Sequence, residues 1–269
     1  MFDLARLEAQ LAGTVYARKL HFTPVTGSTN NDAMAAARNG APHGSVFFAD
    51  EQRAGRGRGD HTWHSAAGEG LYVSVLLRPG FAPAWLPLAP LAAGLAAAEA
   101  IRSVTGLEID LRWPNDLMLG PRKTGGILVE AQTQSRPESN AVAFVVVGIG
   151  INVHQREFAP DLATPATSLD LELGHVFGQR TSRQALLAGL LKSLERESAG
   201  LLDGAARASI PARVEAASSW VRGRQVEVHG PQAYAGLTEG LDEHGFLLVR
   251  TADGMVQVQT GGIRATSSS

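Results

Sequence analysis

The sequence predicts an α+β protein in two parts, and three observations support this. Amphipathic helical patterns and strand patterns are interleaved as far as about residue 203. Near residue 204 the composition shifts to a run of small residues, which we interpret as a connector, in part helical. From Val221 onward, short strand patterns are divided by the turn signals Gly230-Pro231 and Asp253-Gly254, which is typical of a small barrel. We therefore expect a larger domain over 1–218 and a barrel over 219–269.

The elements of the first half follow from apolar periodicity and from the residues that bound them. Ser28 and Thr29 are natural N-caps for a helix that Asn39-Gly40 ends. The strand expected after Gly44 leads directly into a loop rich in arginine and glycine. The expected helices cover 3–11, 30–38 and 88–104, and the expected strands cover 19–26, 45–50 and 70–77.

The second half begins with strict alternation in LEIDLRW (107–113), the period of a half-buried strand, which Pro114 ends. The run AVAFVVVGIGI (141–151) is apolar enough for a central strand. The remaining expected elements are a strand over 126–132, a turn over 132–140, an irregular stretch over 155–180 and a helix over 182–199.

Composition excludes several classes of protein. Apolar residues make up 44% of 269 residues, which is enough for a packed core. The net charge of −2 argues against a general nucleic-acid or membrane-surface binder. The chain has no cysteine, so it has no disulfide and no thiol nucleophile, and this fits a cytoplasmic location. The longest apolar stretch is interrupted by Pro87, Pro90 and Gly94, which favours a buried helix over a membrane span.

The stretch QRAGRGRGDHTWHS (52–65) is the first candidate site. Its glycines let the backbone approach a ligand closely, and Arg56 and Arg58 offer permanent forked cations for a phosphate or a carboxylate. A solvated charged loop is the alternative, and long Arg-Gly repeats occur in RNA-binding tails. This stretch is short and lies between strands, so we interpret it as an anion-binding loop.

RWPNDLMLGPRKTGGILVE (112–130) is the second candidate. Asn115 and Asp116 are ordinary turn residues, but a lysine just before two glycines and a buried run is unusual as pure structure. Lys123 is placed like a cation over a reacting phosphate. Asp116 could bind Mg²⁺ or orient a nucleophile.

Other motifs are weak or missing. There is no G-x-x-x-x-G-K-[ST] loop and no G-x-S-x-G elbow, and GIGINV (148–153) has Val153 where a dinucleotide fingerprint needs glycine. Asn152 either turns the chain or offers its amide to an adenine edge. His61 and His64 have i,i+3 spacing but no further clustered ligands, so a metal site there is improbable.

Four motifs in order resemble the biotin–protein ligases, and together they cover about 20–265. They are GSTN (27–30), EQRAGRGR with W and S (51–65), RWPNDLML with RKTGGILVE (112–130) and VGIGINV (147–153). The resemblance implies a core like that of the class II aminoacyl-tRNA synthetases, with a mixed, largely antiparallel sheet, helices on one side and a C-terminal SH3-like β-barrel. It implies two half-reactions, in which biotin and Mg·ATP give biotinyl-5′-AMP and a carrier lysine then takes the biotin.

The resemblance also implies a role for each matching residue. Lys123, Arg58 and Asp116 would be catalytic, with Asp116 near the Mg²⁺ ion. Biotin would be held by Ser28, Thr29, Asn30, Gln52, Gly55, Arg56, Arg58, Lys123, Gly125 and Gly126. ATP would be held by Arg56, Arg58, Trp63, Arg112, Asn115, Asp116, Lys123 and Asn152.

The sequence departs from the family pattern at two places. The Arg-Gly loop continues as GDHT (59–62), so His61 stands where a further arginine is usual, and this bears on closure of the loop and retention of the adenylate. Arg112 stands where the family has lysine, which keeps the charge and changes its geometry.

The resemblance implies a biotin carboxyl carrier protein as the partner and leaves a homodimer open. Only 26 residues precede GSTN, too few for the DNA-binding domain of bifunctional members, so we expect no DNA partner, and no membrane partner. Two alternatives remain. A lipoate–protein ligase shares the fold and the adenylate chemistry, and a non-catalytic nucleic-acid-binding module would explain the Arg-Gly loop and the barrel.

Overall fold

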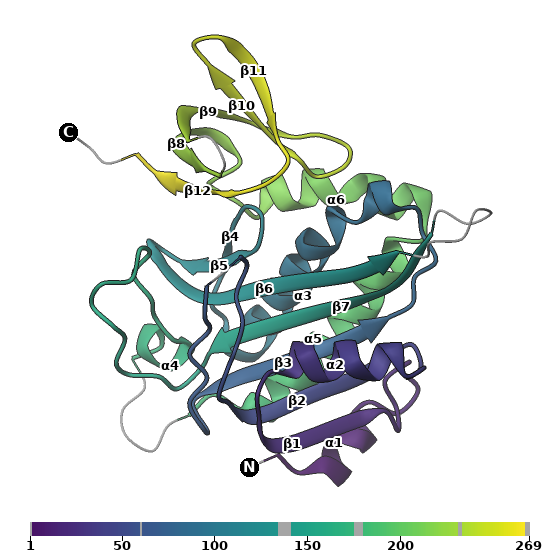
Figure 1. Cartoon of the computed structure of the whole chain (residues 1–269). Helices are drawn as coiled ribbons and strands as arrows, with labels where there is room; N and C mark the ends of the chain where they lie inside the picture. Colours follow the sequence, from purple (N-terminus) through teal and green to yellow (C-terminus); the bar gives the residue numbers. More distant parts are fainter. Residues whose placement is uncertain (1, 60, 134–140, 175–179, 231–232, 267–269) are drawn as a thin grey trace.

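Across the residues that it describes, the computed structural model contains a seven-stranded sheet, a smaller five-stranded sheet and six α-helices (Figure 1). It describes residues 2–59, 61–133, 141–174, 180–230 and 233–266. The large sheet has the order β1-β2-β3-β7-β6-β5-β4, and only β1 and β2 are parallel. The predicted mixed, largely antiparallel sheet is therefore confirmed. Its strands are β1 Leu20–Thr26, β2 Ser45–Gln52, β3 Gly70–Leu77, β4 Asp110–Arg112, β5 Asp116–Leu119, β6 Arg122–Thr133 and β7 Val142–Asn152.

Helices cover both faces of this sheet, which differs from the expectation of helices on one side (Figure 1). The main apolar core takes Val73 and Val75 of β3, together with α3 and α5. The alternate residue Leu76 faces a second, smaller core with Ala33 and Ala37 of α2. Because strand side chains alternate between faces, α2 lies opposite α3 and α5, on the face that carries the polar residues. The helices of the first half are α1 Leu4–Gln10, α2 Thr29–Arg38 and α3 Leu88–Thr105.

Four elements differ from the sequence-based expectation. The strand expected over 107–113 is only β4, and the expected turn after it opens into the short strand β5. The expected irregular stretch contains α4 Leu169–Glu172, and the connector is the complete helix α6 Gly204–Ala216. Asp203 caps α6, and Ile210, Pro211 and Val214 are buried, so packing outweighs the proline inside the helix. Most of the expected turn over 132–140 lies outside the described residues.

The C-terminal part is a five-stranded antiparallel sheet in the order β11-β10-β9-β8-β12. It lies beside β4, β5 and α6 at the top of Figure 1, and α5 Arg183–Gly200 leads up to α6 from the large sheet. The sequence patterns QVEVH (225–229), AYAGLTEGL (233–241), FLLVR (246–250) and MVQVQ (255–259) predict four of its strands. They miss the fifth, whose four residues are too few for a clear alternation. Its strands are β8 Arg222–His229, β9 Tyr234–Leu241, β10 Leu247–Thr251, β11 Gly254–Val258 and β12 Gly262–Ala265.

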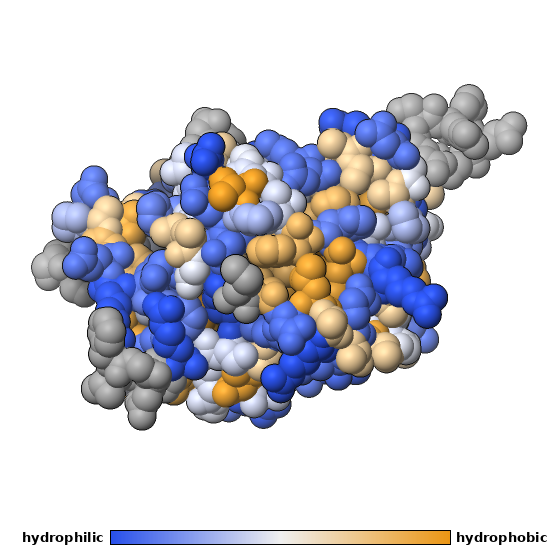
Figure 2. Space-filling model, turned by 90° about the horizontal axis from the view of Figure 1, so that it is seen from below, coloured by the Kyte–Doolittle hydropathy of each residue, from blue (hydrophilic) through white to orange (hydrophobic). Residues whose placement is uncertain are grey.

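Side-chain contacts at residues 244–245 help to connect the C-terminal part to the first part of the chain. The buried Trp113 donates its indole N–H to Gly245 O at 3.0 Å, and Trp85 stacks on His244 with ring centroids 4.8 Å apart. On the face shown in Figure 2, hydrophobic residues form separate patches among hydrophilic ones, which is ordinary for a folded surface. Within the described ranges, no helix has the length and apolar character needed to cross a bilayer.

Candidate active site

A cavity of about 970 Å³ lies on the face of the large sheet that carries α2. Its walls are strands β3, β6 and β7, the Arg-Gly loop, the segment 155–166 and the C-terminal sheet around β12. The volume is at the upper end of the range for small-molecule sites. It brings together most of the predicted site residues: Ser28, Thr29, Asn30, Gln52, Arg56, Arg58, Trp63, Arg112, Asn115, Asp116, Lys123, Gly126 and Asn152.

Buried amides and hydroxyls form one end of the cavity. Thr29 donates from its backbone N–H to Gln52 Oε1 at 2.9 Å and from its hydroxyl to the same oxygen at 3.0 Å. Ser74 on β3 lies 2.8 Å from the Thr29 hydroxyl and donates to Asn30 Oδ1. This cluster offers donors and acceptors without net charge, which suits a small neutral polar ring. The sequence patterns missed Ser74, which alternates with buried valines in an apolar strand.

Ser28 is the N-cap residue of α2, as expected, but its hydroxyl makes no capping hydrogen bond. It is 2% exposed and lines the cavity. A buried hydroxyl that the helix does not use is available to a ligand. The start of α2 therefore begins the helix and also provides polar groups to the cavity.

Glycines form the floor of the cavity where β6 and β7 pass beneath two side chains. A Cβ at Gly148 would lie 2.0 Å from Asn30 Oδ1, and a Cβ at Gly150 would lie 2.5 Å from Trp63 Nε1. The same position at Gly126 would meet the Trp63 ring at 3.4 Å. The motif G-I-G-I-N is therefore an alternating strand, with glycines toward the cavity and isoleucines toward the core.

Gly55 and Gly125 do not line the cavity. A Cβ at Gly55 would lie 2.4 Å from Trp63 O, so this glycine allows the two arms of the Arg-Gly loop to approach each other. Gly125 faces the opposite side of β6, where a Cβ would meet Leu117 Cδ1 at 2.8 Å. Both glycines therefore allow close packing behind the residues that line the cavity.

Charged side chains form the next part of the cavity. Asp116 Oδ1 lies 2.5 Å from Lys123 Nζ, and Asp116 Oδ2 lies 2.5 Å from Arg112 Nη2. Burial alone would raise the pKa of Asp116, but Lys123 and Arg112 outweigh it and hold that pKa below its usual value. The Lys123 ammonium also lies 5.6 Å from the centre of the Trp63 ring. The cluster combines two cations with one carboxylate and is suited to an anionic ligand.

The donor set around Asp116 does not fit a resident metal ion. Each of its carboxylate oxygens already carries a cationic partner. In the part of the chain that the structure describes, no group of three or more His, Cys, Asp or Glu could hold a metal. The role predicted for Asp116 as a metal ligand therefore finds no further protein ligand beside it.

The arginines of the Arg-Gly loop have different partners. Arg56 binds both oxygens of Glu130 on β6 and also donates to Asn31 Oδ1 at 2.8 Å. Arg58 donates to Asn115 Oδ1 at 3.2 Å and to Gly261 O at 2.8 Å. Arg58 thus connects the loop to the C-terminal sheet, while burial lowers its pKa. The loop closes through its backbone, because Gly57 N–H donates to His61 O at 2.7 Å.

Two residues that line the cavity carry buried polar atoms without protein partners. Trp63 Nε1 and Gln155 Oε1 are buried, and neither has a hydrogen-bond partner in the described structure. Asn152 donates from its side-chain amide to Thr167 O at 3.0 Å. Buried polar atoms left unpaired are costly, so a ligand that pairs with them gains affinity. Sequence reasoning missed Gln155 and the lining residues of the C-terminal sheet, which only the folded chain brings here.

Two family models match the chain. That of the biotin/lipoate A/B protein ligase family matches residues 22–152, and that of the biotin protein ligase C-terminal domain matches 222–263. The biotin--[acetyl-CoA-carboxylase] ligase of Mycobacterium tuberculosis is 34% identical over 256 residues, which cover 91% of this chain and 88% of that protein. The bifunctional ligase/repressor BirA of Bacillus subtilis is 31% identical over 252 residues, covering 93% of this chain and 74% of that protein.

A solved structure is also similar to this chain over nearly its whole length. The biotin protein ligase from Aquifex aeolicus, in complex with biotin and ATP, has a TM-score of 0.75 and 27% identity to this chain. The match covers 92% of this chain and 98% of that one. The similarity therefore extends over both sheets.

Proposed function

Because the chain belongs to the biotin–protein ligases, within the biotin/lipoate A/B protein ligase family, we propose that its cavity activates biotin with ATP and transfers it to a lysine of a carrier protein. One observation carries the proposal. A single cavity joins a buried amide and hydroxyl cluster, at Thr29, Gln52 and Ser74, to the cationic cluster at Lys123. The first suits a cyclic urea, and the second suits a carboxylate meeting a phosphate.

The lipoate alternative fits the cavity less well. The dithiolane ring of lipoate offers no strong hydrogen-bond donor or acceptor. It would gain no hydrogen bonds from the buried polar groups of Thr29, Asn30 and Ser74, which therefore give it no affinity. Biotin has a urea oxygen and two N–H groups that pair with such groups. The cluster therefore favours biotin.

In the first half-reaction, a biotin carboxylate oxygen attacks the α-phosphorus of ATP, and the bond to pyrophosphate breaks. Lys123 and Arg58 stabilise the negative charge that gathers around phosphorus, because both are cations fixed before the reaction begins. Asp116 holds Lys123 and Arg112 in place. A magnesium ion bound to the phosphates of ATP as part of the substrate would supply further charge neutralisation.

In the second half-reaction, the ε-amine of the carrier lysine attacks the carbonyl carbon of biotinyl-5′-AMP. The carbon–oxygen bond to AMP breaks, the amine loses a proton, and an amide forms. No nucleophile from the enzyme is needed. The acceptor is the biotin carboxyl carrier domain of a carboxylase, which accords with the names of the relatives from Mycobacterium tuberculosis and Paracoccus denitrificans.

The remaining assignments belong to the same proposal. Ser28, Thr29, Asn30 and Gln52 bind the urea ring, while Gly126 allows close approach at the floor. Trp63, Asn115 and Asn152 contact the nucleotide, and Gly55 and Gly125 act through packing. The catalytic domain ends near residue 218, and the enzyme works in the cytoplasm without DNA.

Pyrophosphate release tests the proposal. The protein is mixed with Mg·ATP and either biotin or lipoate, and release is followed over time. We expect release with biotin and none above background with lipoate. Release with lipoate alone would move the substrate to the other branch of the family. No release, together with nucleic-acid binding that falls steeply with salt and ignores ATP, would favour the non-catalytic alternative.

A further inference from the structure

One wall of the cavity is an irregular loop over 155–166. It follows β7 and precedes the four-residue helix α4. Phe158, Leu162 and Thr164 of this loop line the cavity. A segment without regular structure has no hydrogen-bond ladder of its own, so its position depends on a few contacts. On its C-terminal side Arg112 donates to the Thr164 hydroxyl at 3.0 Å and Lys123 N–H donates to Pro165 O at 2.8 Å, and further contacts lie at its base.

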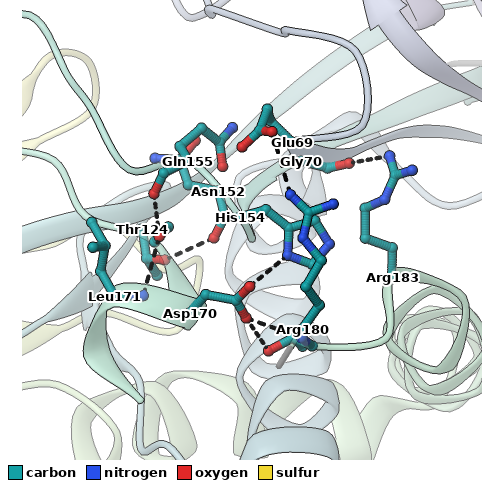
Figure 3. Close-up of polar contacts among 12 residues, drawn as sticks. Glu69, Gly70, Thr124, Asn152, His154, Gln155, Asp170, Leu171, Arg180 and Arg183 are labelled. Atoms are coloured by element: carbon teal, nitrogen blue, oxygen red, sulfur yellow. Dashed lines mark hydrogen bonds and ion pairs between the residues drawn. The ribbon is translucent and has the colours of Figure 1, made fainter. Parts of the chain in front are cut away.

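The two ends of the loop are tied together at its base. Asp170 N–H donates to Val153 O at 2.9 Å, and the Ser168 hydroxyl donates to Gln155 O at 2.6 Å. At the centre of these contacts, His154 Nδ1 lies 2.7 Å from Asp170 Oδ2 (Figure 3). The imidazole is 6% exposed and the carboxylate 2%, so the pair is shielded from water. His154 itself does not line the cavity, but its neighbours Gln155 and Asn152 do.

Asp170 extends the connection to helix α5. Its other oxygen, Oδ1, accepts hydrogen bonds from the backbone N–H and the hydroxyl of Thr181, at 3.0 and 2.7 Å. These bonds and His154 hold the pKa of Asp170 below its usual value in spite of burial. An ionised carboxylate only accepts hydrogen bonds, so Nδ1 of His154 carries the donated proton.

Other charges surround the pair without entering the cavity. Arg183 donates to Gly70 O at 3.1 Å and lies 2.8 Å from Asp50, and Arg180 lies 3.7 Å from Glu69. Burial lowers the pKa of His154 although Asp170 acts in the opposite direction, so a neutral imidazole is favoured at neutral pH. Figure 3 shows the histidine between Glu69, Arg180 and Asp170. A neutral ring fixed by one short bond is suited to holding position, because it brings no net charge into the wall.

We propose that the His154–Asp170 pair is a positioning element of the biotinylation site, which closes the base of the 155–166 loop and so fixes the wall against which the nucleotide binds. The inference rests on the proposed function in one respect, because it assigns the part of the cavity around Asn152 and Gln155 to the nucleotide. Both residues flank His154 in sequence and line the cavity. The cluster of Thr29, Asn30 and Ser74 is held by hydrogen bonds among its own members and to Gln52, and none of these bonds involves the loop. The pair therefore acts on nucleotide affinity and leaves biotin affinity unchanged.

The test is calorimetric binding to the full chain. One titration uses biotin, and the other uses the unreactive analogue α,β-methylene-ATP with Mg²⁺ at saturating biotin. His154→Leu removes the bond to Asp170 and keeps an apolar volume. His154→Asn is the matched control, because the amide nitrogen of asparagine stands close to the place of Nδ1 and donates to the same carboxylate. Thr181→Val is a milder change that removes only the hydroxyl bond to Asp170 Oδ1.

We expect His154→Leu to weaken binding of the nucleotide analogue by about tenfold, the effect of one hydrogen bond to a charged group. Biotin affinity should stay within about twofold, because it does not depend on this hydrogen bond. His154→Asn should restore most of the nucleotide affinity, and Thr181→Val should give a smaller loss than His154→Leu. If His154→Leu does not fold, the comparison of Thr181→Val with the parent decides, and an unchanged nucleotide affinity there overturns the inference.

Other results also overturn it. Equal weakening of biotin and nucleotide would mean a general structural role, and so would a lower melting temperature with unchanged affinities. A His154→Asn variant as weak as His154→Leu would mean that the bond to Asp170 is not the cause. Normal binding by the parent without pyrophosphate release would instead contradict the proposed function alone.

Discussion

At the scale of single residues, the electrostatics of the cavity centre on Lys123. Its ammonium lies 2.5 Å from Asp116 Oδ1, and the strand that carries it is fixed to the cavity wall, because Lys123 N–H donates to Pro165 O at 2.8 Å. Lys123 is also half-buried, so its charge is screened less than that of a surface lysine. Lys123 is therefore the cation best placed to stabilise the negative charge that develops around the α-phosphorus of ATP.

Replacing Lys123 with alanine should reduce the rate of pyrophosphate release by about 100- to 1,000-fold, the usual effect of removing one preorganised charge from a reacting centre. Arg122→Ala is the matched control. The side chain of Arg122, which precedes Lys123 in the sequence, is exposed and pairs with Glu172 outside the cavity. That variant should keep the parent rate. A Lys123→Ala enzyme with near-normal release and normal melting would disprove the catalytic role.

Arg58→Gly should have a different effect, because Arg58 joins the Arg-Gly loop to Gly261 of the C-terminal sheet. Loss of this contact should let biotinyl-5′-AMP leave early and label lysines of unrelated proteins. Arg53→Gly is the control, since Arg53 is exposed and pairs with Glu51. Biotinylation of serum albumin included in the reaction measures the leak, and equal labelling by Arg58→Gly and the parent enzyme would count against a retaining role.

The sequence predicted those residues whose chemistry is unusual for their place. Two arginines among glycines and a lysine before Gly125 and Gly126 have few purely structural uses, and Arg58 and Lys123 both line the cavity. Ser74 and Gln155 could not be predicted, because a serine in an apolar strand and a glutamine in a loop are common. Their importance comes from neighbours that are distant in sequence.

At the scale of elements, β7 connects sequence pattern and site most directly. It lies between β3 and β6 along nearly its whole length, as expected for an apolar run in a central strand. Gly148 and Gly150 face the cavity because strand side chains alternate. They are glycines because Asn30 and Trp63 occupy the space that larger side chains would need. The site therefore depends on the absence of side chains from this strand as much as on polar groups elsewhere.

Gly150→Ala should destabilise the protein by about 1–3 kcal/mol, the typical effect of overpacking, and should weaken ATP binding by displacing Trp63. Gly204→Ala is the control, because it lies at the start of α6 and its nearest neighbour is a flexible arginine 4.0 Å away. Urea unfolding and calorimetry measure the two effects. Unchanged stability and affinity in Gly150→Ala would mean that the floor is not closely packed.

Long elements with clear periodicity were predicted well, and short ones were not. β3 and α3 match their expected ranges closely because eight or more residues repeat one pattern. β5, β12 and α4 have only four residues each, and pairing and packing hold them rather than local preference. The connector was predicted as only partly helical because it is a run of small residues, whereas the cap at Asp203 and the burial of α6 make it a complete helix.

At the scale of the whole molecule, the cavity has walls from both sheets. Residues around Gly261 and Ile263 line it together with β3, β6 and β7. A composition shift near residue 204 predicted two parts, but a single sequence carries no signal that the second part completes the site. For example, Trp113 donates to Gly245 O, which lies 132 residues further along the chain. No local sequence pattern predicts such a contact.

Acid should destabilise the whole fold through two buried carboxylates. The pKa values of Asp116 and Asp170 are both lower in the folded protein than the usual 3.8. Their contribution to stability is therefore complete above the unfolded pKa and is lost as the pH falls through the folded values. The free energy of unfolding in urea should drop below about pH 4. Asp116→Asn should weaken that dependence, and an unchanged pH profile would contradict the assigned pKa direction.

Intact-mass spectrometry of a biotin carboxyl carrier domain is the most direct test of the central claim. The domain is incubated with the protein, Mg·ATP and biotin, with lipoate in a parallel reaction and the Lys123→Ala variant as the enzyme control. The account predicts one biotinyl group on one lysine, only with ATP and only with biotin, and far less of it from Lys123→Ala than from the parent enzyme in the same time. Addition of lipoate instead of biotin, or no addition by a folded enzyme that binds both substrates, would contradict it.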